Sequence, residues 1–410
     1  MEREAVRRSL VAPLAVWGVT RAVLLLFVFR VYVFPGPDVT SDVSVTYQGW
    51  YEVLRHGTFP LSDVTWQYPP GAALAVLSPA ALPFLSYPHA FFLLAFLADA
   101  AVLAALLVAG RRPGRSPRGA RVWVAGVPLL GPTVYARYDV MVTAVAVAAL
   151  LAGARRPRVL GALAAFGALL KVWPVLLLAG AGRRAWRTAA VTAAGLAALF
   201  AVTVPGAFAF LAFQRERGTE VESLGALVLH VARHFGWRGQ VLLNYGSIEF
   251  LGPYVDRVST AALALSAVAF GWLLLWRLRA GRLAPHVLAE AALTAVLLST
   301  VTSRVISPQY LVWLVGLAAV CLSYRASRMT APALLVVLAS FVTVLEFPLG
   351  FAHVVASDGY GIALLVVRDG LLLAAGLTAA RRLWSSAPAA EPTAPFPPHP
   401  TRPKQSPVSS

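Results

Sequence analysis

Charged side chains are scarce in this sequence. Asp, Glu, Lys and Arg together make up 13% of the 410 residues, whereas hydrophobic residues make up 59%. Mean hydropathy is correspondingly high, at +0.71. A water-soluble domain of this length needs far more polar surface. The scarcity of charge therefore excludes a soluble globular protein and indicates an integral membrane protein.

Cysteine and alternating strand patterns are also lacking. The single cysteine, Cys321, lies in an apolar run, so no disulfide can form within the chain. Instead of strands, apolar runs recur that are long enough to cross a hydrocarbon core, and helices satisfy their own backbone hydrogen bonds in lipid. We predict an all-α fold, a polytopic membrane helical bundle of roughly 10–12 spans including half-helices.

Acidic residues are few, and the formal net charge is +17. The arginines do not form the continuous surface that a nucleic acid would need. They come in short bursts between apolar runs, which is the pattern of cytoplasmic loops. We therefore predict no nucleic-acid partner. The bursts lie at residues 111–121, 155–158, 183–187, 277–282, 325–328 and 381–382.

The N-terminal apolar stretch, Leu10 to Phe34, is too long for a signal peptide and lacks a clear cleavage site, so we predict an uncleaved first helix. The N-terminus and the tail would be cytoplasmic. Residues 1–384 would form the membrane domain, and residues 385–410, rich in Pro, Ser and Ala, a disordered tail. Four spans are expected near residues 258–276, 287–302, 309–324 and 330–346.

Two polar stretches, residues 35–69 and 213–256, are predicted to be large extracytoplasmic loops. The apolar stretch at 70–85 is short and contains Pro79 and Pro83, so we predict a re-entrant or membrane-surface helix. Twelve of the 18 acidic residues would then lie at one membrane face, which would hold the polar chemistry. The twelve are Asp38, Asp42, Glu52, Asp63, Asp139, Glu216, Glu220, Glu222, Glu249, Asp256, Glu346 and Asp358.

Lysine is almost absent. Apart from Lys404 in the tail, the chain has only Lys171, which lies in an apolar run just before Pro174. Proline disfavours helix at this point, so we predict two half-helices that break there. A lysine at membrane depth either extends to the interface or faces a polar cavity or partner. As a compact charge it suits a phosphate or pyrophosphate, and we predict that role.

Several segments occur together in a familiar order. An acidic residue and aromatics follow the first helix, and a Tyr-Pro-Pro sequence begins at Tyr68. The chain resembles the GT-C superfamily of integral membrane glycosyltransferases, and more narrowly glycosyltransferase family 87, whose members use polyprenol-phosphate sugars. The resemblance covers nearly the whole chain except the tail. Its further segments are Leu97–Asp99, Gly131–Asp139, Lys171–Pro174, Arg217–Ser223 and Ser307–Trp313.

This resemblance implies an inverting sugar transfer at the extracytoplasmic face. A carboxylate in the first loop would act as general base; Asp42 matches best by position, with Asp38 as its substitute. The donor would be a polyprenyl-phosphate sugar, with mannose first among the hexoses and pentoses, and the acceptor a glycolipid, glycan or protein. Cations would stabilise the departing phosphate. The candidates for that role are Lys171, Arg137 and Arg304.

Further residues are expected to bind substrate or phosphate, and several of the candidates also have a plainer interpretation. Asp38 and Asp42 could cap a helix, and Arg137 could form a simple ion pair with Asp139. Glu222 could order its own loop, and a structural role is favoured for Tyr68. The further candidates are Asp139, Glu222, Arg217, Gln309, His353 and Tyr68.

No cofactor is predicted. Some GT-C enzymes use a divalent cation, but Asp38 and Asp42 do not form an Asp-x-Asp pair and no His/Cys cluster exists, so support for a metal is weak. The expected partners are a lipid-linked sugar donor, a membrane-associated acceptor and membrane lipids.

A transporter or flippase of lipid-linked saccharides is the alternative, since it would also bury charges such as Lys171, Asp99 and Glu290. No inverted repeat supports it. A scaffold that only presents loops to partners would not explain Lys171. For the charges within spans, namely Arg21, Asp99, Glu290 and Asp369, we expect internal pairing.

Overall fold

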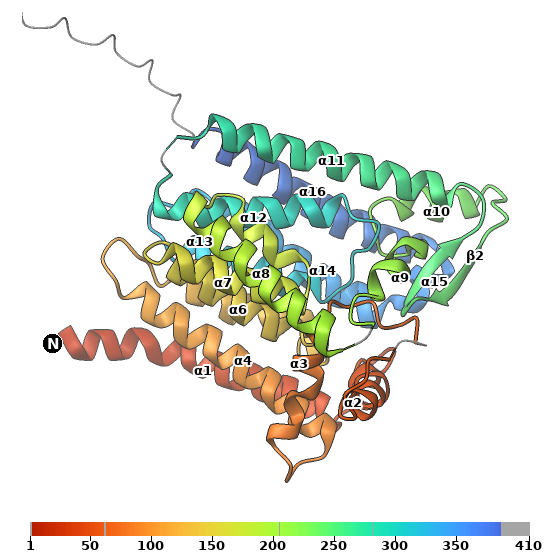
Figure 1. The fold of residues 1–410 in the computed structure, drawn as a ribbon, viewed down its shortest axis with the longest axis horizontal. Coiled ribbons are helices and arrows are strands. Elements are labelled where there is room, and N and C mark those ends of the chain that lie inside the picture. Colours follow the sequence, from red (N-terminus) through yellow and green to blue (C-terminus); the bar gives the residue numbers. More distant parts are fainter. Residues whose placement is uncertain (1, 61–62, 205, 282, 387–410) are drawn as a thin grey trace, which may run out of the picture.

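The computed structural model describes residues 2–60, 63–204, 206–281 and 283–386. Its helices form one bundle in which most of the long axes run side by side (Figure 1). Among the described residues, six helices are long and apolar enough to cross a membrane. They are α1 (Glu2–Val28), α4 (Tyr87–Gly110), α8 (Arg183–Thr203), α11 (Val255–Arg279), α14 (Thr330–Val344, continued by the turn η5, Leu345–Leu349) and α16 (Gly359–Trp384). The predicted helical membrane bundle is confirmed, and the chain is a multi-pass membrane protein.

Shorter apolar helices fill the space between these six. Most residues of α12 (Pro285–Val301) and α13 (Tyr310–Leu322) are buried, as expected of helices that are hydrophobic on all sides. The helix α3 (Ala72–Leu77) with the turn η2 (Ser78–Ala81) spans about 15 Å, half of a hydrocarbon core, which fits the predicted re-entrant segment. The others are α5 (Arg118–Gly126), η3 (Val127–Val134), α6 (Asp139–Gly153), α7 (Pro157–Leu170), α12 (Pro285–Val301) and α13 (Tyr310–Leu322).

The predicted break near Lys171 is confirmed. Helix α7 ends at Leu170, and Lys171 has extended backbone angles, with φ −159° and ψ 132°. The turn η4 (Trp173–Leu178) follows, with Pro174 in its first turn, where a missing N–H costs nothing. The break places Lys171 between two helical segments.

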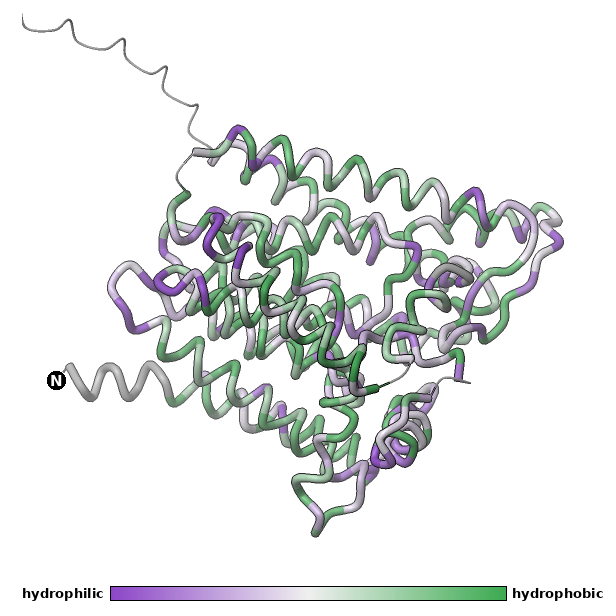
Figure 2. The backbone as a smooth tube through the Cα atoms, in the orientation of Figure 1, coloured by the Kyte–Doolittle hydropathy of each residue, from purple (hydrophilic) through white to green (hydrophobic). Residues whose placement is uncertain are grey.

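The arginine-rich loops gather at one end of the bundle. Arg325 donates its backbone N–H to Gly114 O (3.1 Å), and the Arg115 guanidinium lies 3.4 Å from the centre of the Tyr324 ring. We call this the arginine end, and the opposite one the loop end. Hydrophilic residues concentrate at both ends, whereas the helices between them are mainly hydrophobic (Figure 2).

The loop end contains more regular structure than the sequence indicated. Residues 213–256, predicted as a loop, hold a three-stranded antiparallel sheet in the order β1-β3-β2, in which Tyr245 and Gly246 form a two-residue turn with positive φ. The first helix also ends earlier than predicted, at Val28, and part of residues 35–69 is helical. The elements of the loop end are η1 (Asp42–Tyr47), α2 (Gln48–Leu54), α9 (Phe210–Glu216), β1 (Thr219–Glu220), α10 (Ala226–Arg233), β2 (Gln240–Asn244), β3 (Ser247–Leu251) and α15 (Phe351–Ala356).

Arg21, Asp99 and Asp369 form ion pairs inside the bundle, as predicted, whereas Glu290 has only neutral hydrogen-bond donors among the described residues. Arg21 on α1 lies 2.8 Å from Asp99 on α4, and both are fully buried. Trp123 and Tyr135 also donate to this carboxylate, which therefore joins α1, α4, α5 and the residue that follows η3. Likewise, Glu290 accepts hydrogen bonds from Ser327 and from the backbone of Arg328, and Asp369 pairs with Arg368. Of the predicted tail, residues 387–410 lie outside the described residues.

Candidate active site

A cavity of about 1340 Å³ begins at the loop end and extends along the bundle. Asp42, Lys171 and Glu220 line its polar part. The apolar part follows α11 from Phe270 towards Arg277, near the C-terminal end of that helix. The cavity is thus a charged chamber with a long hydrophobic extension.

Asp42 and Arg137 form an ion pair on the cavity wall. Arg137 Nη2 lies 2.6 Å from Asp42 Oδ2, and the Asp42 side chain is 42% exposed. Arg137 also donates to the backbone oxygens of Val39 and Ala136, which fixes its guanidinium. The alternative pair between Arg137 and Asp139 does not form. Asp42 therefore presents an oriented carboxylate to the cavity.

Asp38 lines the same cavity, but its oxygens are engaged locally. Oδ1 accepts from the Thr40 N–H (3.0 Å) and hydroxyl (2.6 Å), and Oδ2 lies 2.8 Å from Arg30. Such bonds between an aspartate and the residues just after it stabilise a turn. The structure thus favours a structural role for Asp38 and leaves Asp42 as the better placed base.

Lys171 lines the cavity and forms an ion pair with Asp139, which lies on the side away from the cavity. Its Nζ lies 2.7 Å from Oδ1 of Asp139, which also accepts the Trp313 indole N–H at 2.7 Å. Asp139 is almost fully buried and does not line the cavity. An ammonium has three N–H donors, so the bond to Asp139 leaves donors for a ligand. The rings of Tyr68, Tyr138, Tyr310 and Trp313 surround Nζ at 5.1–5.5 Å from their centres.

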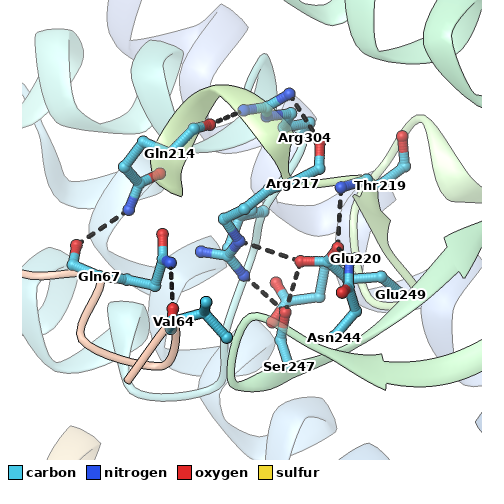
Figure 3. Close-up of polar contacts among 12 residues, drawn as sticks. Val64, Gln67, Gln214, Arg217, Thr219, Glu220, Asn244, Ser247, Glu249 and Arg304 are labelled. Atoms are coloured by element: carbon cyan, nitrogen blue, oxygen red, sulfur yellow. Dashed lines mark hydrogen bonds and ion pairs between the residues drawn. The ribbon is translucent and has the colours of Figure 1, made fainter. Parts of the chain in front are cut away.

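Arg217 lines the cavity beside the sheet (Figure 3). Its Nε donates to Glu249 Oε1 (2.9 Å), and its Nη2 donates to the hydroxyl of Ser247 (2.5 Å). Glu249 also accepts from Gly218 N (2.8 Å) and from the Asn244 amide (2.9 Å). Both oxygens of Glu249 are thereby satisfied, and Arg217 is held rigidly in place.

Arg304 does not line the cavity. Its guanidinium donates to the backbone oxygens of Arg217 (2.9 Å) and Gln214, and Gln214 in turn donates to the backbone oxygen of Gln67 at 2.9 Å. This chain of contacts joins residues 35–69 to residues 213–256 (Figure 3). The position of Arg304 supports a structural role rather than the predicted contact with phosphate.

Glu222 lines the cavity next to a buried cluster that the sequence did not reveal. Arg368 Nη1 lies 2.6 Å from Glu346 Oε2 and 3.8 Å from Glu222 Oε1, and the guanidinium also pairs with Asp369 at 2.9 Å. Three carboxylates share one guanidinium. Burial, followed by the charge of Glu346, raises the pKa of Glu222 well above its ordinary value.

The remaining candidates divide between the cavity and the surface. Gln309 and Tyr68 line the cavity. His353 does not; its exposed ring lies 2.5 Å from Asp358, so the predicted assistance at the phosphate finds no support in its position. Glu220 also lines the cavity but was not singled out from the sequence. Among the described residues, no three His, Cys, Asp or Glu side chains are grouped so that they could hold a metal ion.

A sequence model of Glycosyltransferase family 87 matches residues 66–308. The matched region contains Lys171, Arg217 and Glu220, and begins after Asp42. No curated protein and no solved structure matches the chain.

Proposed function

Because the match covers more than half of the 410 residues, the chain belongs to glycosyltransferase family 87, and we propose that it transfers a sugar from a polyprenyl-phosphate donor to a glycolipid, glycan or protein. Mannose or another hexose or pentose is the proposed sugar. The transfer would take place at the loop end, which we assign to the extracytoplasmic face because the arginine loops belong in the cytoplasm.

The observation that carries the proposal is the shared cavity of Asp42 and Lys171. A base and a cation in one chamber suit a phosphosugar, and the apolar extension suits a polyprenyl chain. The extension is lined by Leu176, Phe270 and Leu274, among others, and the whole cavity exceeds the usual 300–1,000 Å³ of a small-molecule site. A lipid donor fits this combination better than a soluble one.

The chemistry follows from the positions of these groups. Asp42 accepts the proton of an acceptor hydroxyl while the oxygen of that hydroxyl forms a bond to the anomeric carbon of the donor sugar. The bond from that carbon to the phosphate oxygen breaks, and polyprenyl phosphate leaves with the electron pair. Lys171 stabilises the charge that grows on this phosphate. Attack on the face opposite the leaving group inverts the anomeric configuration.

The test is transfer by purified protein in lipid, with radiolabelled polyprenyl-phosphate mannose and a membrane extract as acceptor source. Removal of the base, in Asp42→Asn, should lower transfer by about 10²–10⁴-fold. Asp38→Asn is the matched control, because its side chain is equally exposed (41% against 42%) on the same cavity. It should retain most of the activity.

Two results would count against the proposal. Transfer by Asp42→Asn at the wild-type rate would remove Asp42 from the mechanism. Absence of transfer by the wild type, together with movement of the lipid-linked sugar across the bilayer that Asp42→Asn leaves unchanged, would favour the transporter instead. The thermal unfolding of each variant shows whether a loss of activity reflects a loss of fold.

A further inference from the structure

Glu220 is a second carboxylate in the polar part of the cavity. It is the last residue of β1, and its side chain is among the groups that line the cavity, although the residue is only 3% exposed. Carboxylates are almost never buried to this degree unless their oxygens are paired. The hydrogen bonds of Glu220 therefore indicate what the site is built to hold.

One oxygen of Glu220 is fixed and the other is open. Oε1 accepts the Ser307 hydroxyl at 3.0 Å, and the backbone N–H donates to Arg304 O at 3.0 Å. Oε2 has no hydrogen-bond partner among the described residues. The bond from Ser307 holds the carboxylate and the backbone bond holds the residue in place, so the free oxygen has a defined position.

The neighbouring Glu249 shows the contrast. The two glutamates are paired in register across β1 and β3 and lie beside Arg217 (Figure 3). Arg217 gives its hydrogen bonds to Glu249 and Ser247, and Glu249 does not line the cavity. Glu249 thus stabilises the sheet and its surroundings, whereas Oε2 of Glu220 remains a free acceptor in the cavity that Lys171 also lines.

We propose that Oε2 of Glu220 accepts a hydrogen bond from a sugar hydroxyl, in the substrate complex of the transferase proposed above. Sugar hydroxyls are the donors that such an enzyme admits to the chamber, and a carboxylate binds a hydroxyl more strongly than a neutral acceptor does. The hydroxyl belongs either to the donor sugar or to the acceptor. Glu220 binds and orients substrate, whereas Asp42 moves the proton.

Steady-state kinetics with each substrate varied in turn separates these sources. Glu220→Ala should raise one KM by about ten- to a hundredfold, the effect of losing a hydrogen bond to a charged group. Glu220→Gln should raise the same KM less, because its amide oxygen still accepts. A rise in the donor KM identifies the donor sugar, and a rise in the acceptor KM identifies the acceptor.

Ser307→Ala provides an independent variant if Glu220→Ala does not fold. It leaves the carboxylate in place but frees Oε1, so it should raise the same KM by a smaller factor. Wild-type KM values for both substrates in Glu220→Gln and Ser307→Ala would overturn the proposal, and so would a fall in kcat alone. Either result would overturn only the role of Glu220, because the wild-type protein would still transfer sugar. Absence of wild-type transfer would instead overturn the proposed function itself.

Discussion

Removal of the Lys171 ammonium tests whether this lysine serves the fold, the phosphate or both. Lys171 and Asp139 are 11% and 1% exposed, and their charged atoms lie 2.7 Å apart. Lys171→Met preserves the length of the side chain and leaves Asp139 without its counter-ion. The indole N–H of Trp313 is then the remaining donor to this carboxylate among the described residues.

The expected cost is large, because a buried charge is left alone. Removing one partner of a buried ion pair costs about 3–5 kcal/mol of stability. Asp139→Asn should cost less, since the aromatic rings around Nζ each stabilise a cation by about 0.5–2 kcal/mol. In the double variant no charge remains. Its cost should therefore fall short of the sum of the two single costs by about 1–3 kcal/mol.

The assay combines thermal unfolding in lipid nanodiscs with transfer kinetics for all four proteins. We expect the double variant to recover stability relative to Lys171→Met but not activity, because the leaving phosphate still lacks its cation. Recovery of wild-type transfer would show that Lys171 serves only to balance Asp139, and the proposed phosphate contact would be wrong. Strictly additive costs would show that the pair does not stabilise the fold. Trp313→Phe, which removes the other donor to Asp139, is the control.

Two further predictions concern stability and topology. Because the pKa of Glu222 is raised, the native protein binds a proton at this residue more tightly than the unfolded chain does. The contribution of Glu222 to the stability of the fold is therefore fully present below the ordinary pKa of 4.5, and it is lost as the pH rises through the raised pKa. Glu222→Gln should flatten this decline by up to about 1.4 kcal/mol per pH unit, and parallel curves of stability against pH would contradict it. For topology, Phe235→Cys at an 85% exposed position of the loop end should react with an impermeant maleimide on intact cells, and Arg112→Cys only after lysis. The native Cys321 is fully buried and should not react with the maleimide. The reverse labelling pattern would place the site in the cytoplasm.

Most of the bundle could be predicted because membrane helices are specified locally. A continuous apolar run is sufficient to predict a membrane helix, and the four stretches expected between residues 258 and 346 correspond to α11, α12, α13 and α14. Of these, α11 and α14 are long enough to cross a membrane, whereas α12 and α13 are shorter. The apolar run at residues 122–136 is less regular. It divides into α5 and the tighter turn η3, where Pro128 and Pro132 interrupt the α-helical bonding and Gly131 has a φ of 61°. Hydrophobicity indicates that a segment lies in the membrane, but not how its backbone bends there.

The sheet at the loop end could not be predicted, for a different reason. Strand β1 has only two residues and pairs with residues 249 and 250 further along the chain. Leu242 and Leu243 on β2 are both exposed, so the hairpin lacks the alternation that marks a half-buried strand. Its existence depends on contacts between segments that are separate in sequence.

The pairing of charges is likewise a property of the fold. Arg137 and Asp139 are two residues apart, and the sequence suggested that any ion pair of either residue would be with the other. The start of α6 separates them: Tyr138 precedes the helix, and Asp139 lies in its first turn. Arg137 is thereby left on the cavity wall with Asp42, whereas Asp139 lies behind the wall and pairs with Lys171, which lines the cavity. The sequence could predict that Asp42 and Lys171 share a site, but not which groups hold them.

Glu220 could not be identified from the sequence for the same reason. In sequence it is one of two glutamates in a single loop segment, and Glu222 is equally plausible. In the fold, Arg217 is committed to Glu249, and the free oxygen of Glu220 lacks a donor that would stabilise it. An unpaired buried acceptor costs about 1–3 kcal/mol. Such a cost is expected where function requires it, and here a sugar hydroxyl would supply the missing donor.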